Sequence, residues 1–372
     1  MPAKVTLIAD WKAFFELEES WKTLYHSLDF KRPFQSWEWV KTWVEIYGLQ
    51  VEPAIFVVRD ENKIIGIVPL YIENRGKWPL SGRILRFLGD QVVSTEFQDV
   101  LTATGYYSIV WWNVLHWLLS RATLDWDFFF LDDMALAAPS VQILKQLSRK
   151  LGLSFHQTVK NVLPVLDLER DWDTWVRTHP NRDFISMTRN RARRLRKKMD
   201  VRVQLIRGEE EFATAIEIFF DLHQKNWTAR GLSGSFATEE KREFYRRVGR
   251  AFLKNGWLQF RLSYLNGQPA TGEFGVLLDN VYYSLQSGYD PKFRKQNMGH
   301  FLFYEIIHTL AIEGVKRVEF LRGGEKYKFS WGAREQFSGT LWVGNHSLPG
   351  FFHPFYKRQK HRIKHLVKGK IS

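Results

Sequence analysis

The sequence predicts a mixed α/β fold, in which helices pack on mixed sheets and the chain forms two domains. Its 372 residues suffice for two domains of ordinary size. Hydrophobic residues make up 45% and charged residues 25%, the composition of a folded soluble protein. Stretches with the apolar period of a helix alternate with stretches that have the period of a strand in both halves, and this pattern indicates sheets covered by helices.

Residues 1–165 are expected to form the N-terminal domain. A polar turn separates two strand patterns, EPAIFVVRD and KIIGIVPLYI. The near-apolar stretch 106–120 contains Asn113 and His116 and is too short to span a bilayer, so we interpret it as a buried or partly buried helix. The other expected elements are helices at 11–28, 36–47 and 139–151, and strands at 126–133, 153–157 and 162–168.

Residues 201–350 are expected to form the C-terminal domain, after a basic helical connector at 166–200 and before a basic tail at 351–372. Its centre reads as an antiparallel meander of three strands at 257–265, 269–278 and 281–287, joined by the turns NGQ and DN. A polar loop and a helix from about Gly299 to Ile312 follow it. The remaining expected elements are strands at 201–207 and 315–321 and helices at 209–230 and 238–254.

The net charge of +14 is concentrated in two segments. Residues 189–198 and 357–370 each hold seven Lys or Arg and no acid, which together equal the whole excess. Each segment is either a solvated helix face or a contact surface for an anionic partner: a membrane, a polyphosphate cofactor or a nucleic acid. No signal-peptide pattern opens the chain, so we expect a cytoplasmic protein, with a place at the inner face of the membrane also open.

The loop before the expected helix at 299–312 has the residues of a phosphate site. A helix start offers unpaired backbone N–H groups and the positive end of the helix dipole, and a diphosphate can bind there. Asn297 and Gly299 tolerate the tight turn, and Arg294, Lys295 and His300 add positive charge. A single Gly before a helix is otherwise a common cap.

The same loop resembles the acyl-CoA loop of GNAT acyltransferases, Arg/Gln-x-x-Gly-x-Gly/Ala followed by an apolar helix. Here Arg294-Lys295-Gln296-Asn297-Met298-Gly299 precedes His300-Phe301-Leu302, and Asn297 stands where the family has its middle Gly. The resemblance implies that Arg294, Lys295, Gln296, Asn297, Met298, Gly299 and His300 hold acetyl-CoA or another acyl-CoA as co-substrate. Lys328 is expected to pair with the diphosphate or with an acidic acceptor, or to be solvated.

A wider resemblance covers 222–236, 282–307 and 318–333. These segments, with the basic run RNRARRLRKK, resemble the CelD-like acetyltransferases of cellulose biosynthesis, a family that is similar to the Fem peptidyltransferases and their two GNAT-like domains. The resemblance implies two tandem GNAT-like domains, of which the C-terminal one carries the acyl-CoA motif. It also implies a transfer to the amine or hydroxyl of a sugar or another envelope or exopolysaccharide precursor.

Four residues are candidates for the catalysis. GNAT enzymes often take a Tyr as the acid, and Tyr327 has a comparable position; the alternative is a ring packed in the core. Glu273 lies in the apolar strand pattern ATGEFGVLL, where burial would raise its pKa and suit it as a base, unless it faces outward from an edge. Glu325 follows two glycines and could be a base or an orienting group. His223 shares a helix face with Trp227 and Arg230.

Other reaction classes have no support in the sequence. With no cysteines, the chain has no disulfide, thiolate nucleophile or Cys-zinc site, and no HExxH, P-loop or GxSxG motif is present, so we expect no metal. Two alternatives to an acyl-CoA enzyme stay open. One is a Fem-like ligase that takes an aminoacyl group from tRNA, and the other is a degenerate GNAT pair that acts as a scaffold.

Overall fold

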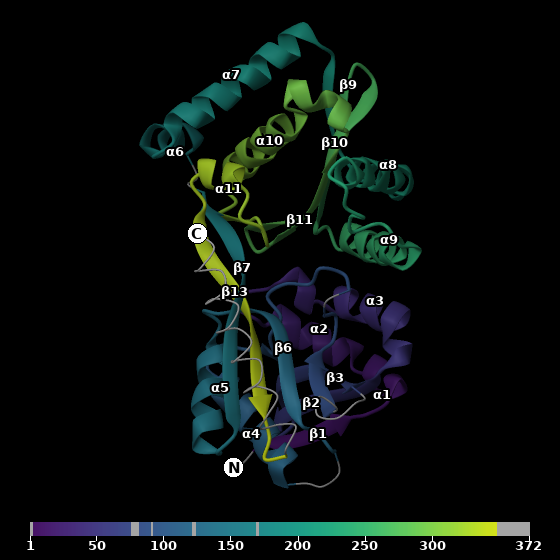
Figure 1. Cartoon of the computed structure of the whole chain (residues 1–372), viewed down its shortest axis with the longest axis vertical. Helices are drawn as coiled ribbons and strands as arrows, with labels where there is room; N and C mark the ends of the chain where they lie inside the picture. Colours follow the sequence, from purple (N-terminus) through teal and green to yellow (C-terminus); the bar gives the residue numbers. More distant parts are fainter. Residues whose placement is uncertain (1–2, 76–81, 91, 121–123, 169–170, 348–372) are drawn as a thin grey trace, which may run out of the picture. The chain divides into compact units, whose positions relative to one another are not determined.

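The computed structural model describes residues 3–75, 82–90, 92–120, 124–168 and 171–347. They divide into two compact units. The first unit contains the described residues up to 161 and those after 336, and the second unit contains residues 162–336 (Figure 1). The expected basic tail at 351–372, with its segment 357–370, lies outside the described residues.

The first unit is a mixed sheet with helices packed against it. Its strand order is β1-β2-β3-β4-β6-β13-β7, with β5 beside β3. The pairs β1–β2, β2–β3, β3–β4, β3–β5 and β6–β13 are antiparallel, whereas β4–β6 is parallel. Its elements are β1 (Lys4–Ile8), α1 (Trp11–Phe15), α2 (Glu18–His26), α3 (Trp37–Tyr47), β2 (Glu52–Asp60), β3 (Lys63–Arg75), β4 (Gly82–Phe87), β5 (Leu101–Thr102), α4 (Tyr107–Ser120), β6 (Phe128–Ala135), α5 (Pro139–Lys150), the first part of β7 (Ser154–Asp167) and most of β13 (Arg334–Gly344).

The second unit repeats this plan. Its strand order is β7-β12-β11-β10-β9-β8, and β11–β12 is the parallel pair. Its elements are the end of β7, α6 (Trp172–Thr178), α7 (Arg182–Lys198), β8 (Val201–Leu205), α8 (Glu209–Thr228), α9 (Glu239–Lys254), β9 (Leu258–Leu265), β10 (Gln268–Leu278), β11 (Val281–Tyr289), the 3-10 helix η3 (Pro291–Gln296), α10 (Met298–Ile312), β12 (Arg317–Glu319) and α11 (Lys326–Ser330).

The two units share their order of elements. In each, a strand and helices precede an antiparallel meander of three strands, β2–β3–β4 in the first unit and β9–β10–β11 in the second. A helix then leads to a strand parallel to the last one, through α4 to β6 and through α10 to β12. The predicted mixed α/β class and the three-strand meander of the second half are confirmed.

Two strands differ from the sequence-based expectation. The two short strands expected at 153–157 and 162–168 are one strand, β7, which begins in the first unit and ends in the second. No strand was expected at β13, and residues up to 350 were assigned to the C-terminal domain. In the structure β13 pairs with β6, from Ser338 opposite Ala135 to Gly344 opposite Phe128, so its residues after 336 belong to the first unit.

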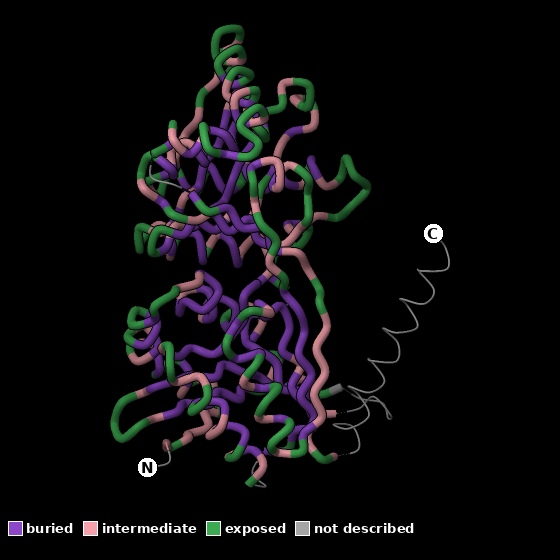
Figure 2. Tube along the Cα trace, turned by 90° about the vertical axis from the view of Figure 1, so that its left-hand side faces the viewer, coloured by how far each residue is buried: buried purple, intermediate pink, exposed green. Residues whose placement is uncertain are grey.

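The second unit encloses its sheet between two layers of helices. Figure 1 shows α10 and α7 on one side of β10, and α8 and α9 on the other. On the α10 side, a core cluster includes Phe301, Ile306 and Leu310, while Phe219 of α8 packs against β10 on the opposite side. Buried residues fill the interior of each unit (Figure 2). Among the residues that the structure describes, no helix has both the length and the apolar character needed to cross a bilayer.

Candidate active site

The parallel strands β11 and β12 part at a defined point. Their pairing ends where Tyr283 lies opposite Glu319, although β11 continues to Tyr289. A register shift between β10 and β11 leaves Leu285 as an extra residue there, between Ser284 and Gln286. Such a bulge bends the strand that carries it. Beyond the end of its pairing with β12, β11 thus continues with residues 284–289.

The start of α10 stands after this strand and is not capped by any side chain. Asn297 ends η3 with φ 55° and ψ 41°, the left-handed conformation that Asn adopts more readily than most residues, so it meets the backbone demand of the Gly that the family has here. A Cβ at Gly299 would have no atom within 4 Å. The first turn contains no acid. An open, uncapped helix start of this kind favours an anion.

The other loop residues contribute in different ways. Arg294 and Lys295 are exposed and form no ion pair with any described residue. Met298 is buried in the core, so the part of it that can face a ligand is its backbone. A buried side-chain oxygen of Gln296 has no hydrogen-bond partner among the described residues. The ring of His300 lies 5.9 Å from that of Tyr327, and burial, aided by nearby Arg191, lowers the pKa of this histidine.

Glu273 points from β10 into the side of the sheet that α10 covers. It is 1% exposed, and the hydroxyl of Ser284 on β11 donates a hydrogen bond to its Oε1 atom. Burial raises the pKa of Glu273 to about 8; the Ser284 hydrogen bond and the positive charges of Lys328 and Arg261 act in the opposite direction. A carboxyl group with a pKa in this range can take up a proton near neutral pH.

Tyr327 lies in α11, close to both the helix start and the carboxyl group. Its ring packs against Phe303 at 5.6 Å, in addition to His300. Burial raises the pKa of the Tyr327 hydroxyl, and the negative charges of Glu273 and Glu325 raise it further, so this group keeps its proton. The structure thus brings together three of the predicted elements: the loop before α10, the carboxyl group of Glu273 and the hydroxyl of Tyr327.

Comparison with known proteins agrees with this geometry. Residues 182–329 match the model of a family described as acetyltransferase (GNAT) domain. This part of the chain is similar to a GNAT-type acetyltransferase domain. The match begins with α7 and ends in α11, so it contains both the open helix start and Glu273.

Solved structures resemble the chain over both units. A crystal structure of FemX is 12% identical, covers 91% of this chain and 96% of that chain, and has a TM-score of 0.58. The C-terminal domain of a putative lysylphosphatidylglycerol synthetase from Agrobacterium fabrum is 10% identical, covers 91% and 94%, and has a TM-score of 0.54. No curated protein matches the sequence. At these identities the likeness shows the fold alone.

Two of the predicted site residues, Lys328 and Glu325, form contacts within the second unit. Nζ of Lys328 donates to the backbone oxygens of Phe320, Arg322 and Gly323, at 3.3, 3.2 and 3.1 Å. It also lies 2.9 Å from Oε2 of Glu325. These contacts engage all the donors of the ammonium group, and they also engage the Glu325 carboxylate. The structure therefore places the buried ammonium group of Lys328 at the base of the loop between β12 and α11, where it pairs with the exposed Glu325.

His223 lies on the other side of the sheet. It is buried in α8, where its ring meets those of Phe236 at 4.6 Å and Trp227 at 5.7 Å. Burial lowers the pKa of this imidazole to about 4, so it is neutral at physiological pH. Because α8 and α10 cover opposite sides of β10, the structure does not bring His223 to Glu273 or Tyr327.

Three further polar residues surround Glu273, and none of them was among the predicted catalytic or cofactor-binding residues. Besides Ser284, these are Arg261, opposite Glu273 on β9, and Tyr282 on β11. Both are buried, and Nη1 of Arg261 and the hydroxyl of Tyr282 have no hydrogen-bond partner among the described residues. A charged residue inside the apolar strand pattern QFRLS was the one available signal for Arg261.

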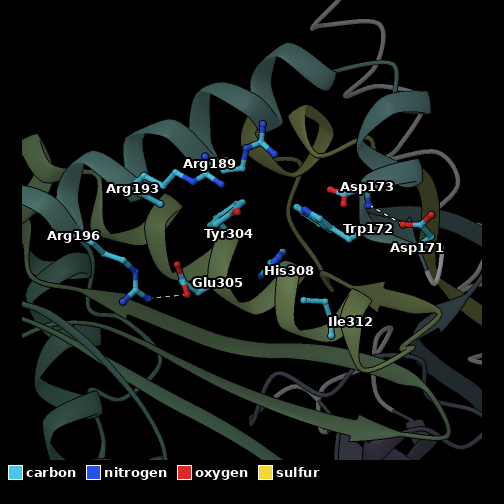
Figure 3. A pocket seen from close by; sticks show the side chains of 11 residues that line it. Asp171, Trp172, Asp173, Arg189, Arg193, Arg196, Tyr304, Glu305, His308 and Ile312 are labelled. Atoms are coloured by element: carbon cyan, nitrogen blue, oxygen red, sulfur yellow. Dashed lines mark hydrogen bonds and ion pairs between the residues drawn. The ribbon is translucent and has the colours of Figure 1, made fainter.

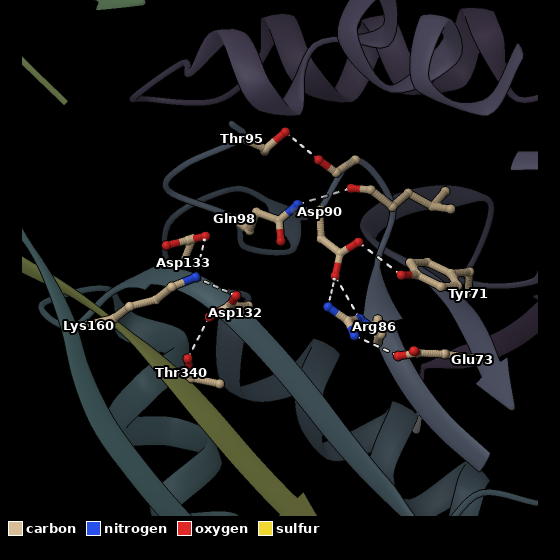
Figure 4. Close-up of polar contacts among 12 residues, drawn as sticks. Tyr71, Glu73, Arg86, Asp90, Thr95, Gln98, Asp132, Asp133, Lys160 and Thr340 are labelled. Atoms are coloured by element: carbon tan, nitrogen blue, oxygen red, sulfur yellow. Dashed lines mark hydrogen bonds and ion pairs between the residues drawn. The ribbon is translucent and has the colours of Figure 1, made fainter. Parts of the chain in front are cut away.

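The corresponding place in the first unit is filled by paired charges. There β4 and β6 part after Leu85 and Phe129, the last pair of their register. Beyond this point Arg86 forms ion pairs with Asp90 and Glu73, at 2.5 and 2.6 Å (Figure 4). In the same region, ion pairs of 2.6 and 3.0 Å join Lys160 to Asp132 and Asp133, and the Tyr71 hydroxyl donates to Asp90 at 2.9 Å.

Proposed function

We propose that the protein is an acyl-CoA-dependent acyltransferase that moves an acyl group directly from the thioester to an amine or hydroxyl. One observation carries this proposal. The uncapped start of α10 and the Glu273–Ser284 pair lie on the same side of one sheet, beside the point where β11 and β12 part. The first is suited to a diphosphate and the second to a proton that must be removed.

The donor side of the reaction rests on the loop. The backbone N–H groups at the start of α10, with Arg294 and Lys295 beside them, would hold the diphosphate of CoA. The open space around Gly299 lets a phosphate approach the backbone. CoA itself supplies the thioester that is to be attacked, and the hydroxyl of Tyr327 would return a proton to the thiolate when the C–S bond breaks.

The acceptor side rests on Ser284 and Glu273. Ser284 is half-buried while Glu273 is fully buried, so the hydroxyl is the part of the pair that an acceptor can reach. As the new C–N or C–O bond forms, the acceptor proton would pass to Ser284 while the proton of Ser284 passes to the Glu273 carboxylate. Each bond change is thereby matched by a proton transfer.

The acceptor that we propose is the amine or hydroxyl of a sugar or another envelope or exopolysaccharide precursor. Its support is the resemblance of segments 222–236, 282–307 and 318–333 to the CelD-like acetyltransferases. The basic segment 189–198, now seen as the exposed part of α7, would favour an anionic membrane surface near such an acceptor.

A Fem-like transfer from aminoacyl-tRNA is the second candidate, and the resemblance of the fold to FemX favours it. The arginines of α7 would then contact nucleic acid. The main argument for a degenerate scaffold was that Asn297 replaces a Gly of the family motif. Asn297 nevertheless adopts the left-handed conformation that this Gly would have supplied, so the argument is weakened.

Thermal unfolding with added ligand tests the proposal. Acetyl-CoA or a longer acyl-CoA should raise the melting temperature as its concentration rises above Kd, because it binds the native state alone. An aminoacyl-tRNA should not. A shift with aminoacyl-tRNA and none with any CoA ester would replace the proposal by the second candidate. If no ligand shifts the melting temperature, the catalytically degenerate scaffold is the candidate that remains.

A further inference from the structure

A groove runs along the outer side of α10, between this helix and the basic helix α7 (Figure 3). Its volume is about 600 Å³, within the range of sites that bind a small organic ligand. It shares none of its lining residues with the candidate active site. The groove therefore needs an explanation of its own.

One wall of the groove is cationic. Arg189, Arg193 and Arg196 follow one another at helical spacing, so all three face the groove from α7. Arg196 is paired with Glu305 of α10 at 2.9 Å. Within the described ranges neither Arg189 nor Arg193 forms an ion pair, and the buried Nε of Arg189 has no acceptor. Unpaired guanidinium groups on one wall are suited to phosphate, which they bind through two parallel hydrogen bonds.

The floor of the groove is aromatic. His308 of α10 lies 5.7 Å from Tyr304, with the two rings nearly parallel, and 4.9 Å from Trp172, which it meets edge to face. Trp172 and Tyr304 are themselves in contact at 6.1 Å. Each ring is held by the other two, and His308 is the most exposed of them. A fixed group of rings beside arginines is the combination that binds a base next to its phosphate.

The end of the groove near α6 is acidic, and its two carboxylates differ. Asp171 caps α6 by accepting hydrogen bonds from the backbone of Asp173 and Thr174, at 3.1 and 3.3 Å. The Asp173 carboxylate has no hydrogen-bond or ion-pair partner among the described residues. A free carboxylate would repel a second phosphate but accepts hydrogen bonds from the hydroxyls of a ribose.

We propose that this groove binds a nucleoside phosphate, with the phosphate on Arg189 and Arg193, the base against His308 and ribose hydroxyls towards Asp173. Two sources can supply such a group: the 3′-phosphoadenosine end of CoA, and a separate nucleotide such as a nucleoside diphosphate that carries an acceptor sugar. The proposal does not depend on acyl transfer, because the groove and the candidate active site have no residue in common.

Calorimetric titration of the full chain tests it with adenosine 3′,5′-bisphosphate, uridine diphosphate, adenosine and inorganic phosphate as probes. We expect at least one nucleotide to bind more tightly than adenosine and than phosphate alone. Arg193→Gln should weaken this binding by about tenfold to 100-fold, the usual effect of a hydrogen bond to a charged group. Arg194→Gln is the matched control, since this exposed neighbour lies outside the groove.

The two sources give different results with CoA. If the groove holds the end of CoA, CoA binds more tightly than dephospho-CoA, and Arg193→Gln removes the difference. If it holds a separate nucleotide, the nucleotide still binds in saturating CoA and in a Gly299→Trp variant. The proposal is overturned if neither nucleotide binds, or if Arg193→Gln and Arg194→Gln weaken binding equally, as general attraction of anions to α7 would require.

Discussion

Ser284 and Glu273 form a hydrogen-bonded pair across two neighbouring strands, with the hydroxyl of Ser284 donating to a carboxylate that is 1% exposed. The pair joins the half-buried hydroxyl to a group whose pKa burial raises to about 8. A proton can thus pass between the half-buried hydroxyl of Ser284 and the buried carboxylate of Glu273. The first prediction concerns this pair.

Glu273→Gln should lower kcat by about 10²- to 10⁴-fold, the usual contribution of a general base, with little change in the Kd of acyl-CoA. In the native protein kcat/KM should rise with pH up to about 8, as Glu273 loses its proton, and then level off. The variant should lack this rise. Steady-state kinetics from pH 6 to about 9.5 would measure it. An unchanged pH profile in Glu273→Gln would assign the titration to another group.

Tyr327→Phe should reduce kcat while leaving acyl-CoA affinity and stability nearly unchanged. The substitution keeps the ring contacts with His300 and Phe303 and removes only the hydroxyl that would protonate the thiolate. Removal of a general acid costs about 10²-fold or more. Kinetics and urea unfolding would be measured together. A loss of stability at unchanged kcat would show that Tyr327 serves only in packing.

Gly299→Trp should abolish the thermal shift produced by acyl-CoA and leave the fold intact. No atom lies within 4 Å of a Cβ at this position, so a side chain can leave the backbone here without a clash at its Cβ, and the indole ring would stand where a phosphate would lie. Gly299→Ala is the control, because one methyl group should weaken binding far less. Equal shifts in the native protein and in the Trp variant would place the diphosphate elsewhere.

Lys328→Met should destabilise the protein without a specific effect on acyl-CoA binding. The ammonium group serves three backbone oxygens, and each buried acceptor left without a donor costs about 1–3 kcal/mol. Urea unfolding would measure the change, and Lys326→Met, an exposed neighbour in α11, provides the comparison. If the Lys328→Met protein is stable but binds acyl-CoA more weakly, Lys328 contributes to the cofactor site.

His223→Phe should retain turnover and gain resistance to acid. The pKa of His223 is about 4 in the folded protein, against 6.5 ordinarily, so between these values the unfolded chain binds a proton that the native protein does not. The free energy of unfolding therefore falls as the pH drops from 6.5 towards 4, and the variant should lose this dependence. Urea unfolding at several pH values would test it. Lost turnover in a stable variant would make His223 part of the site.

The sequence by itself determined the parts of the site that depend on local backbone chemistry. An Asn and a Gly before an apolar helical pattern predicted the loop and the start of α10, because few residues tolerate a left-handed turn. One acid in an apolar strand pattern predicted a raised pKa of Glu273 for the case that the residue is buried, and the structure excluded the alternative, an outward-facing edge position. The basic run at 189–198 predicted a cationic helix.

Only the tertiary structure decided which side chains meet. The register of the β9–β10 hairpin begins with Gln268 opposite Leu265. If this register were regular, Phe260 would lie opposite Glu273. A shift of one residue between Pro269 and Thr271 places Arg261 there instead. His223 lies on the side of the sheet that α8 covers and is therefore not part of the site. Lys328 donates hydrogen bonds to three backbone oxygens. Bulges and long-range packing set these contacts, and residue spacing along the chain does not encode them.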